Sequence, residues 1–317
     1  MRESPACANG EYVTKIRSGR SSRVVDRRGS TGSSGGRSPF GGRSPFGTRG
    51  GGTGGVPIKA GGGVIGLLVV LAFVFLPKLF GGGGGEGSDP FVQPAPREDA
   101  VCESEIEQVV CGAVDDVSLY WEDQFPMSFQ GEFPGTDTVL FAGAVDTGCG
   151  PATAQTGPFY CPADQLVYFD LVFLQQLQDQ FSATGDLAAQ YIVAHEYGHH
   201  VQNVTGISDR VRQAQQQSPD AANEFSVAQE LQADCFAGSW AASVAERGLF
   251  DRPDEITEAL DAAEAVGDDR ILAQSGRVVD PDLFTHGTAE QRRMWFERGF
   301  ETGDPERCTT FDGSLAP

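Results

Sequence analysis

The residues of this chain with the clearest chemical use are two histidines and a glutamate in the run HEYGHH. His195, Glu196 and His199 have HExxH spacing, and the chain of 317 residues contains only four histidines. Residues four apart share one face of an α-helix, so the two imidazoles can point at one metal ion. Neutral imidazole is a standard zinc ligand, and the glutamate could accept the proton of an attacking water. The spacing predicts metal-assisted hydrolysis, and the alternative is a helix with two ordinary histidines.

The residues around this motif predict the helix that would carry it. Asp186 can cap its start, an apolar run continues to Val201, and Gly206 is a stop signal. The run is apolar around most of its circumference, as expected of a buried helix. His200 lies about 100° around the helix from His199. We therefore expect His200 to pack or to support the site, not to bind the metal.

A second helical pattern, at residues 222–247, offers the third ligand that a catalytic zinc needs. Glu230 and Asp234 lie four apart and so share one helix face. Carboxylates on a helix are usually solvated, but a buried pair needs a metal, a cation or hydrogen bonds. We predict Glu230 as a zinc ligand and Asp234 as the group that orients a ligand histidine. The neighbours that predict burial are Phe225, Val227, Leu231, Cys235, Phe236 and Trp240.

The fourth histidine, His286, comes directly before a predicted helix start. Thr288 and Gln291 form a T-x-x-Q capping box, which predicts a helix to about Arg298. Loops that precede helices often carry residues that reach into a site. As a catalytic residue, His286 would donate a hydrogen bond to the oxyanion formed when water attacks a peptide carbonyl. The alternative is a histidine at the surface or at the helix entry.

Several motifs, in order, resemble the bacterial putative neutral zinc metallopeptidase family. They are TGCG…GPFYCPAD, HEYGHHVQ, ELQADCFAG and THGTAEQRRMWFERGF, and they extend from about Cys102 to Cys308. VDRRG at residues 25–29 and the apolar segment at residues 60–80 are also similar to the amino end of that family. The resemblance covers most of the chain.

This resemblance implies a zincin-like α+β domain in which an ExxxD helix lies beside the HExxH helix. The THG…R stretch is also similar to the His-Pro…Arg segment of membrane-bound CAAX-prenyl proteases. In those proteins the histidine stabilises the oxyanion and the arginine supports the site. The corresponding residues here are His286 and Arg292, with Gly287 in place of the proline. The Zn²⁺ ligands and the general base that the family resemblance implies are His195, His199, Glu230 and Glu196.

Composition divides the chain into four parts. Residues 1–59 are rich in Gly, Ser and Arg and include a near repeat of RSPFGG, and we expect them to be disordered. Residues 60–80 are apolar over about 17–20 positions, which predicts one transmembrane helix in a lipid bilayer. The absence of a small-residue cleavage site after this segment argues against a signal peptide. Residues 81–100 resemble a flexible linker, and residues 101–317 would form the zinc metallopeptidase domain.

Charge predicts the orientation in the membrane. Residues 1–59 contain eleven basic and three acidic residues, a net charge of +8, whereas residues 60–317 contain 12 basic and 41 acidic residues, a net charge of −29. Because Lys and Arg stay on the cytoplasmic side, we expect the amino end inside and the catalytic domain outside the cytoplasmic membrane. The acidic domain also argues against nucleic-acid binding, which needs a basic surface.

Six of the seven cysteines follow the apolar segment, where thiols outside the membrane tend to be oxidised. Six cysteines allow fifteen connectivities, and a metal site is disfavoured because none has CxxC spacing. A buried free thiol is the alternative for the cysteine of the second helix. Proximity favours Cys102 with Cys111 and Cys149 with Cys161, which leaves Cys235 for Cys308.

The remaining patterns agree with an α+β domain. We expect helices at residues 102–120 and 171–181 and strands at residues 138–142 and 165–169. The segment at residues 157–170 is our candidate for a sheet edge that pairs with an extended substrate.

Together the patterns predict a membrane-anchored zinc endopeptidase that hydrolyses protein or peptide substrates outside the cytoplasmic membrane. One alternative is a non-catalytic domain, stabilised by zinc, that binds envelope proteins. A purely structural zinc site has no need of a general base such as Glu196. Another alternative is hydrolysis of a non-peptide amide of the cell wall.

Overall fold

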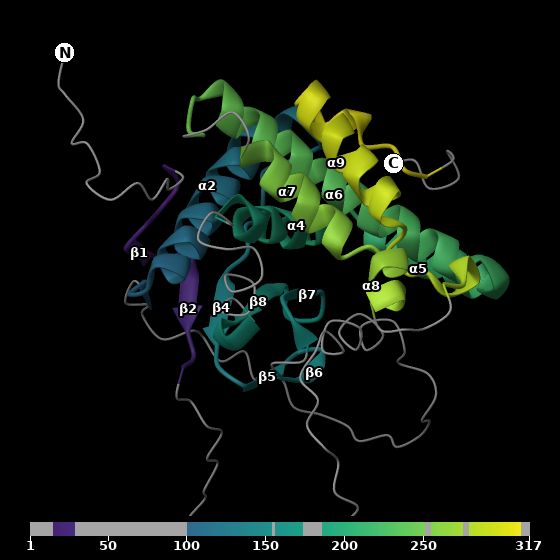
Figure 1. The fold of residues 1–317 in the computed structure, drawn as a ribbon, viewed down its shortest axis with the longest axis horizontal. Coiled ribbons are helices and arrows are strands. Elements are labelled where there is room, and N and C mark those ends of the chain that lie inside the picture. Colours follow the sequence, from purple (N-terminus) through teal and green to yellow (C-terminus); the bar gives the residue numbers. More distant parts are fainter. Residues whose placement is uncertain are drawn as a thin grey trace, which may run out of the picture.

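The structure is a computed structural model, and its fold is an α+β domain in which a small sheet lies beside a group of packed helices (Figure 1). This confirms the predicted α+β class. The described stretches of the chain are 15–28, 100–153, 156–173, 186–250, 255–274 and 279–311.

A mixed four-stranded sheet has the order β2-β4-β8-β7. Its first three strands are parallel, and β7 pairs antiparallel with β8. Two further antiparallel pairs join β1 to β3 and β5 to β6. The strands are β1 (Arg20–Ser21), β2 (Val24–Asp26), β3 (Ala100–Val101), β4 (Thr138–Phe141), β5 (Ala144–Thr147), β6 (Gly150–Thr153), β7 (Phe159–Cys161) and β8 (Leu166–Asp170).

The strand predictions at residues 138–142 and 165–169 are confirmed by β4 and β8 to within one residue. The predicted edge at residues 157–170 is only partly right. β7 is an edge of the sheet in the described part of the chain, but β8 lies inside it, between β4 and β7. β8 is buried on both faces, because Phe169 packs into the helical core whereas Tyr168 packs into a smaller core with the β5–β6 pair.

The helices supply most of the core and confirm the helices predicted around the HExxH, ExxxD and T-x-x-Q motifs. The first helix, predicted at residues 102–120, is shifted toward the carboxyl end and spans Glu105–Ser128. Of the helix predicted at residues 171–181, only 171–173 are described, and these are helical. The helices are α2 (Glu105–Ser128), α4 (Asp186–Val204), α5 (Ile207–Gln217), α6 (Ala222–Glu246), α7 (Glu255–Ala265), α8 (Asp268–Gln274) and α9 (Ala289–Thr302), with short 3-10 helices η3 (Pro219–Ala221), η4 (Pro281–Leu283) and η5 (Pro305–Arg307).

Two close helix crossings fix the elements that carry the motifs. Where α4 meets α6, a Cβ on Gly198 would lie 3.1 Å from the Cα of Ala233. Where α6 meets α9, a Cβ on Gly299 would overlap the carbonyl oxygen of Cys235. Glycine at these positions lets the backbones approach closely enough for short side chains to connect the three helices.

All three expected disulfides are present. One bond closes a short loop at the start of α2, and a second closes a short loop near the sheet. The third bond joins α6 to the segment after α9 across a sequence separation of 73. The bonds are Cys102–Cys111, Cys149–Cys161 and Cys235–Cys308.

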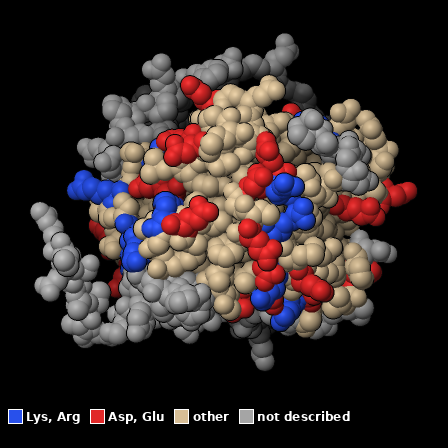
Figure 2. Space-filling view, turned by 90° about the horizontal axis from the view of Figure 1, so that it is seen from above, with Lys and Arg blue, Asp and Glu red and all other residues tan. Residues whose placement is uncertain are grey.

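The outer face of the helical layer carries charges of both signs. Figure 2 shows acidic side chains over this face with basic side chains among them. Arg293 of α9, for example, pairs with Glu264 of α7 at 2.8 Å and with Glu297 of its own helix at 3.0 Å. Such exposed pairs contribute little to stability, on the order of 0–1 kcal/mol each.

Residues 15–28 are ordered, which corrects the prediction that residues 1–59 are disordered; the rest of that segment lies outside the described residues. Ile16 is buried in the main core, and Arg17 pairs with Asp186 at the start of α4 at 2.6 Å. The backbone of β2 finds its partner in β4. The average composition of residues 1–59 gave no sign of the short segment at residues 15–28. Its few apolar side chains pack into a core that other elements build.

The same pairings restrict how the chain can meet a membrane. β1 pairs with β3 and β2 with β4, so residues 20–26 and residues 100–141 must lie on one side of any bilayer. One crossing by residues 60–80 would separate them. A single crossing with the amino end inside and the catalytic domain outside would thus conflict with these strand pairings, and the orientation of the chain stays a prediction.

The predicted membrane segment, residues 60–80, and most of the predicted linker, residues 81–100, lie outside the described residues. Their assignment stays a prediction. Among the residues that the structure describes, no helix has the length and apolarity needed to span a bilayer.

Docking of the amino-terminal segment can be tested with one substitution. Ile16→Ala should lower the free energy of unfolding by about 2 kcal/mol, because it removes apolar volume from a filled core. Leu119→Ala, at a position 56% exposed on α2, is the matched control and should change it by less than about 0.5 kcal/mol. Denaturant unfolding of the two variants measures both values, and equal small effects would show that residue 16 is not packed.

Candidate active site

Three side chains from two helices converge at the crossing of α4 and α6. The Nε2 atom of His195 lies 3.2 Å from one carboxylate oxygen of Glu230, and the Nε2 atom of His199 lies 3.4 Å from the other. The donor atoms of all three residues lie within 4.8 Å of one another. A tetrahedral zinc with bonds of 2.0–2.1 Å requires donors about 3.3 Å apart. The two nitrogen-to-oxygen distances therefore fit one zinc ion.

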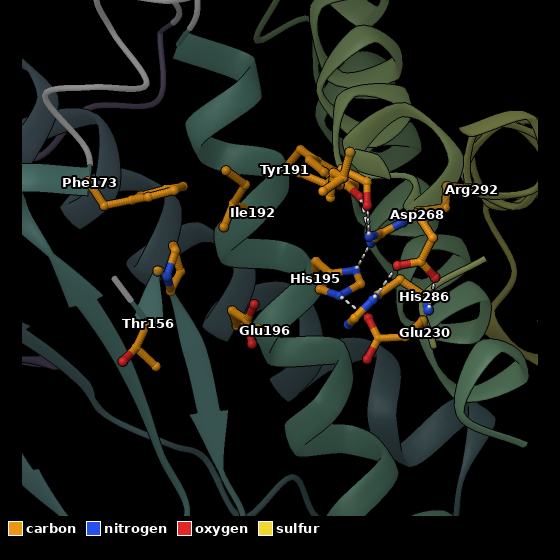
Figure 3. Close-up of a pocket in the computed structure, with 14 residues that line it drawn as sticks. Thr156, Phe173, Tyr191, Ile192, His195, Glu196, Glu230, Asp268, His286 and Arg292 are labelled. Atoms are coloured by element: carbon orange, nitrogen blue, oxygen red, sulfur yellow. Dashed lines mark hydrogen bonds and ion pairs between the residues drawn. The ribbon is translucent and has the colours of Figure 1, made fainter. Parts of the chain in front are cut away.

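Outer contacts fix the ring of His195. Its Nδ1 atom donates to Asp234 at 2.8 Å, which leaves Nε2 free for a metal. Arg292 binds both oxygens of Asp234, at 2.8 and 2.9 Å, and Tyr191 donates its hydroxyl to one of them at 2.6 Å. Figure 3 shows Tyr191, His195 and Arg292 pointing toward one another from α4 and α9. Asp234 thus holds one predicted ligand in place, as the sequence indicated.

Burial and charge oppose each other in this cluster. Burial alone would lower the pKa of His195, but the Asp234 carboxylate outweighs it and raises that pKa to about 9. Burial would raise the pKa of Asp234, yet Arg292 and His195 hold it below its usual value. Glu230 is likewise kept ionised, because the two histidines offset its burial and hold its pKa well below normal. Metal binding must therefore displace a proton from His195.

His199 has its own set of supporting contacts. Its Nδ1 atom donates to the side-chain oxygen of Gln202 at 2.9 Å. The Gln202 amide donates in turn to Gln232 at 3.1 Å, and Gln232 donates to the carbonyl oxygen of Cys308 at 2.8 Å. A chain of amides thus connects His199, the second predicted ligand, to the segment held by the Cys235–Cys308 disulfide.

Glu196 lies beside the ligands but is not part of their cluster. It lines the same cavity, and Figure 3 shows its carboxylate on the sheet side of His195. Burial raises its pKa, and the charges of His199 and His195 counteract this only in part. A carboxylate with a raised pKa that faces a cavity is suited to accept a proton.

His286 reaches the cavity from the loop before α9. Its Nδ1 atom donates to Asp268 at 3.0 Å, and the other oxygen of Asp268 accepts the backbone N–H groups of Thr285, His286 and Gly287. Asp268 thereby fixes both the loop and the ring, so Nε2 is the nitrogen left for a bound molecule. Figure 3 places His286 next to Glu230.

The structure thus brings together all the residues that the sequence singled out for the site. His200 points away from it, as expected, and contacts the hydroxyl of Tyr160 at 3.1 Å. Burial lowers the pKa of His200 to about 4, so the ring is neutral. One cavity, of about 680 Å³ including its open part, is lined by the site residues His195, Glu196, Glu230, His286 and Arg292, among others.

Comparison with known proteins agrees with this donor set. Residues 15–311 match the family described as putative neutral zinc metallopeptidase. The chain belongs to this family. The match begins at residue 15 and so includes the two amino-terminal strands that the structure describes.

Two similar proteins match much of this chain. The uncharacterized protein YpfJ of Escherichia coli strain K12 is 46% identical over 223 residues, which are 70% of this chain and 75% of that protein. The uncharacterized protein Rv2575 of Mycobacterium tuberculosis strain H37Rv is 48% identical over 185 residues, 55% of this chain and 62% of that protein. No solved structure matches this chain.

Three supporting residues of this family member were not predicted from its sequence. Asp268 lies 18 positions before His286 and carries no local motif, so only the fold could pair them. Tyr191 and Gln202 had a usable signal. Tyr191 lies four positions before the first ligand histidine and Gln202 three after the second, and both spacings share a helix face.

The amide chain behind His199 predicts a measurable effect on metal binding. Gln202→Ala should weaken zinc binding about 10- to 100-fold, because the ligand ring loses the partner that orients it. Gln216→Ala, at an exposed position of α5, is the control and should leave the affinity unchanged. Competition with a chelator of known zinc affinity measures both, and equal affinities would remove Gln202 from the site.

Proposed function

We propose that the protein is a zinc-dependent endopeptidase with a zincin-like catalytic centre. The observation that carries the proposal is the placement of Glu196 in the cavity that His195 and Glu230 also line, beside a cluster in which the ligand atoms of His195, His199 and Glu230 all lie within 4.8 Å of one another. Three protein donors leave a fourth position for water or substrate, which is the arrangement of catalytic zinc. A structural zinc is usually enclosed by four protein ligands and needs no base beside it.

The chain's own residues define the remaining chemistry. Zinc, when bound, supplies a Lewis acid that acidifies water and polarises a carbonyl group. Glu196 accepts the proton of the attacking water, and its raised pKa keeps the carboxylate basic enough to do so. The same carboxyl group can then deliver the proton to the leaving amine.

His286 is placed to stabilise the charge that develops on the carbonyl oxygen. Asp268 accepts a hydrogen bond from Nδ1 and so fixes the ring with Nε2 toward the cavity, where an Nε2–H group would donate to the oxyanion. A donor fixed before the reaction stabilises an oxyanion without reorganising in the transition state. The role of Arg292 is indirect. It binds both oxygens of Asp234, and Asp234 in turn holds the ring of His195.

The sheet offers a way to hold an extended peptide. Thr156, Gly157 and Pro158 line the cavity and lead directly into β7. β7 is an edge of the sheet among the described residues, so a substrate could add to it as a further strand. Backbone pairing of this kind suits an internal stretch of a polypeptide, which favours an endopeptidase.

Two substitutions distinguish the role of a general base from the role of a zinc ligand. Glu196→Gln should keep zinc at one ion per chain while hydrolysis of a denatured protein substrate falls at least about a hundredfold. Glu230→Gln should lower the zinc content itself. Elemental analysis and a cleavage assay measure the two effects. Normal turnover by Glu196→Gln would refute the peptidase, and undiminished zinc in Glu230→Gln would remove Glu230 from the ligands.

We also propose that the domain works outside the cytoplasmic membrane. Its three disulfides favour an oxidising compartment. Because β1 and β2 belong to the domain, residues 15–28 would share that compartment. An anchor formed by residues 60–80 would then have to enter and leave the bilayer on the same side.

Cysteine labelling tests this placement. In a Cys7→Ser background, Arg20→Cys and Glu290→Cys introduce thiols at exposed positions of β1 and α9. A membrane-impermeant maleimide should label both in spheroplasts. Labelling of Glu290→Cys alone would restore the single crossing, and labelling of both only after lysis would place the domain inside.

A further inference from the structure

The cavity continues from the ligands into a part with apolar walls. Ile192 lies three residues before His195 and four before Glu196, so the three side chains share one face of α4. Figure 3 shows Ile192 pointing into the cavity, with Phe173 on the side away from the ligands. The other apolar residues of the lining are Pro158, Val266 and Ile271.

Apart from the base Glu196, the charged side chains of the cavity lining lie toward the ligands and are already paired. Arg292 binds Asp234, and Asp268 binds His286. Among the described residues that line this part, none has a charged side chain that could pair with a charged group of a substrate. A charged group in this part would therefore lose its water without gaining a partner.

We propose that this part of the cavity is a subsite for a large apolar side chain, such as Leu, Ile or Phe, of the substrate residue beside the scissile bond. Ile192 is its specificity-determining residue. The proposal rests on the proposed peptidase function and adds the class of substrate that the site takes.

Dimensions support this occupant. One helical turn of about 5.4 Å separates Ile192 from the base Glu196. Residues of an extended substrate peptide rise about 3.3 Å each. When the scissile carbonyl group lies beside Glu196, the side chain of an adjacent substrate residue therefore lies at the level of Ile192. That side chain would lie between Ile192 and Phe173. Ile192 is only partly buried in the core and leaves surface for this contact.

The first test is cleavage of a peptide library by the full-length, zinc-loaded chain. Products are identified by mass spectrometry, and cleavage that persists in Glu196→Gln is subtracted. We expect Leu, Ile and Phe to exceed Asp and Glu at least about tenfold at one position beside the cleaved bond. Ile192→Arg should reduce this ratio at least about tenfold and increase cleavage beside Asp and Glu.

Val172→Arg is the matched control, because position 172 is 45% exposed and is not part of the cavity lining. It should leave the residue preference unchanged. Glu196-dependent cleavage without an apolar preference would overturn the subsite, as would an unchanged preference in Ile192→Arg.

The second test does not depend on activity. In the metal-free full chain with labelled Ile methyl groups, N-acetyl-leucine amide should shift the resonances of Ile192 and Ile271, and N-acetyl-aspartate amide should not. Ile192→Val and Ile271→Val assign the two signals. Shifts without any cleavage would contradict the peptidase and retain the subsite. No shift at Ile192, or equal shifts by both compounds, would overturn the subsite.

Discussion

The structure depends on the burial of one carboxylate, that of Asp234. It is fully buried in α6, and its partners are Arg292 from α9 and His195 and Tyr191 from α4. Removing these charges from water costs several kcal/mol per ion, which their attraction offsets only when geometry and hydrogen bonds are complete. The three helices must therefore pack correctly before the cluster becomes stable. The same event sets the ring of a ligand histidine, so packing and site assembly are coupled.

The rest of the domain can be understood as support for this arrangement. Small residues at the helix crossings bring the backbones close enough for Asp234 to reach both neighbours. The Cys235–Cys308 bond is one residue from Asp234 and holds the segment whose carbonyl group begins the amide chain to His199. Asp268 makes a separate and smaller cluster with His286. The two clusters approach the donors from different elements, so the proposed roles of ligand orientation and oxyanion stabilisation can be altered independently.

Sequence reasoning predicted the parts of this arrangement that have local periodicity. His195, His199, Glu230 and Asp234 lie at spacings of four on helices, and the capping box marked the start of α9. Sequence could not pair Asp268 with His286. That contact forms only when the chain folds back so that the start of α8 meets the loop before α9. It also missed the ordering of residues 15–28. Ile16 and β2 are stabilised by a core and a strand edge from distant residues, and no local composition reports such a partner.

The central claim is that the packing of α4, α6 and α9 around the buried carboxylate of Asp234 creates a zinc site with three protein ligands, His195, His199 and Glu230. Anomalous diffraction from crystals of the purified protein at the zinc absorption edge tests it most directly. We predict one peak per chain, about 2.0–2.2 Å from the Nε2 atoms of His195 and His199 and from a carboxylate oxygen of Glu230, with a fourth position open to the cavity. A peak bound by other residues, or a fourth protein ligand that closes the site, would contradict the account.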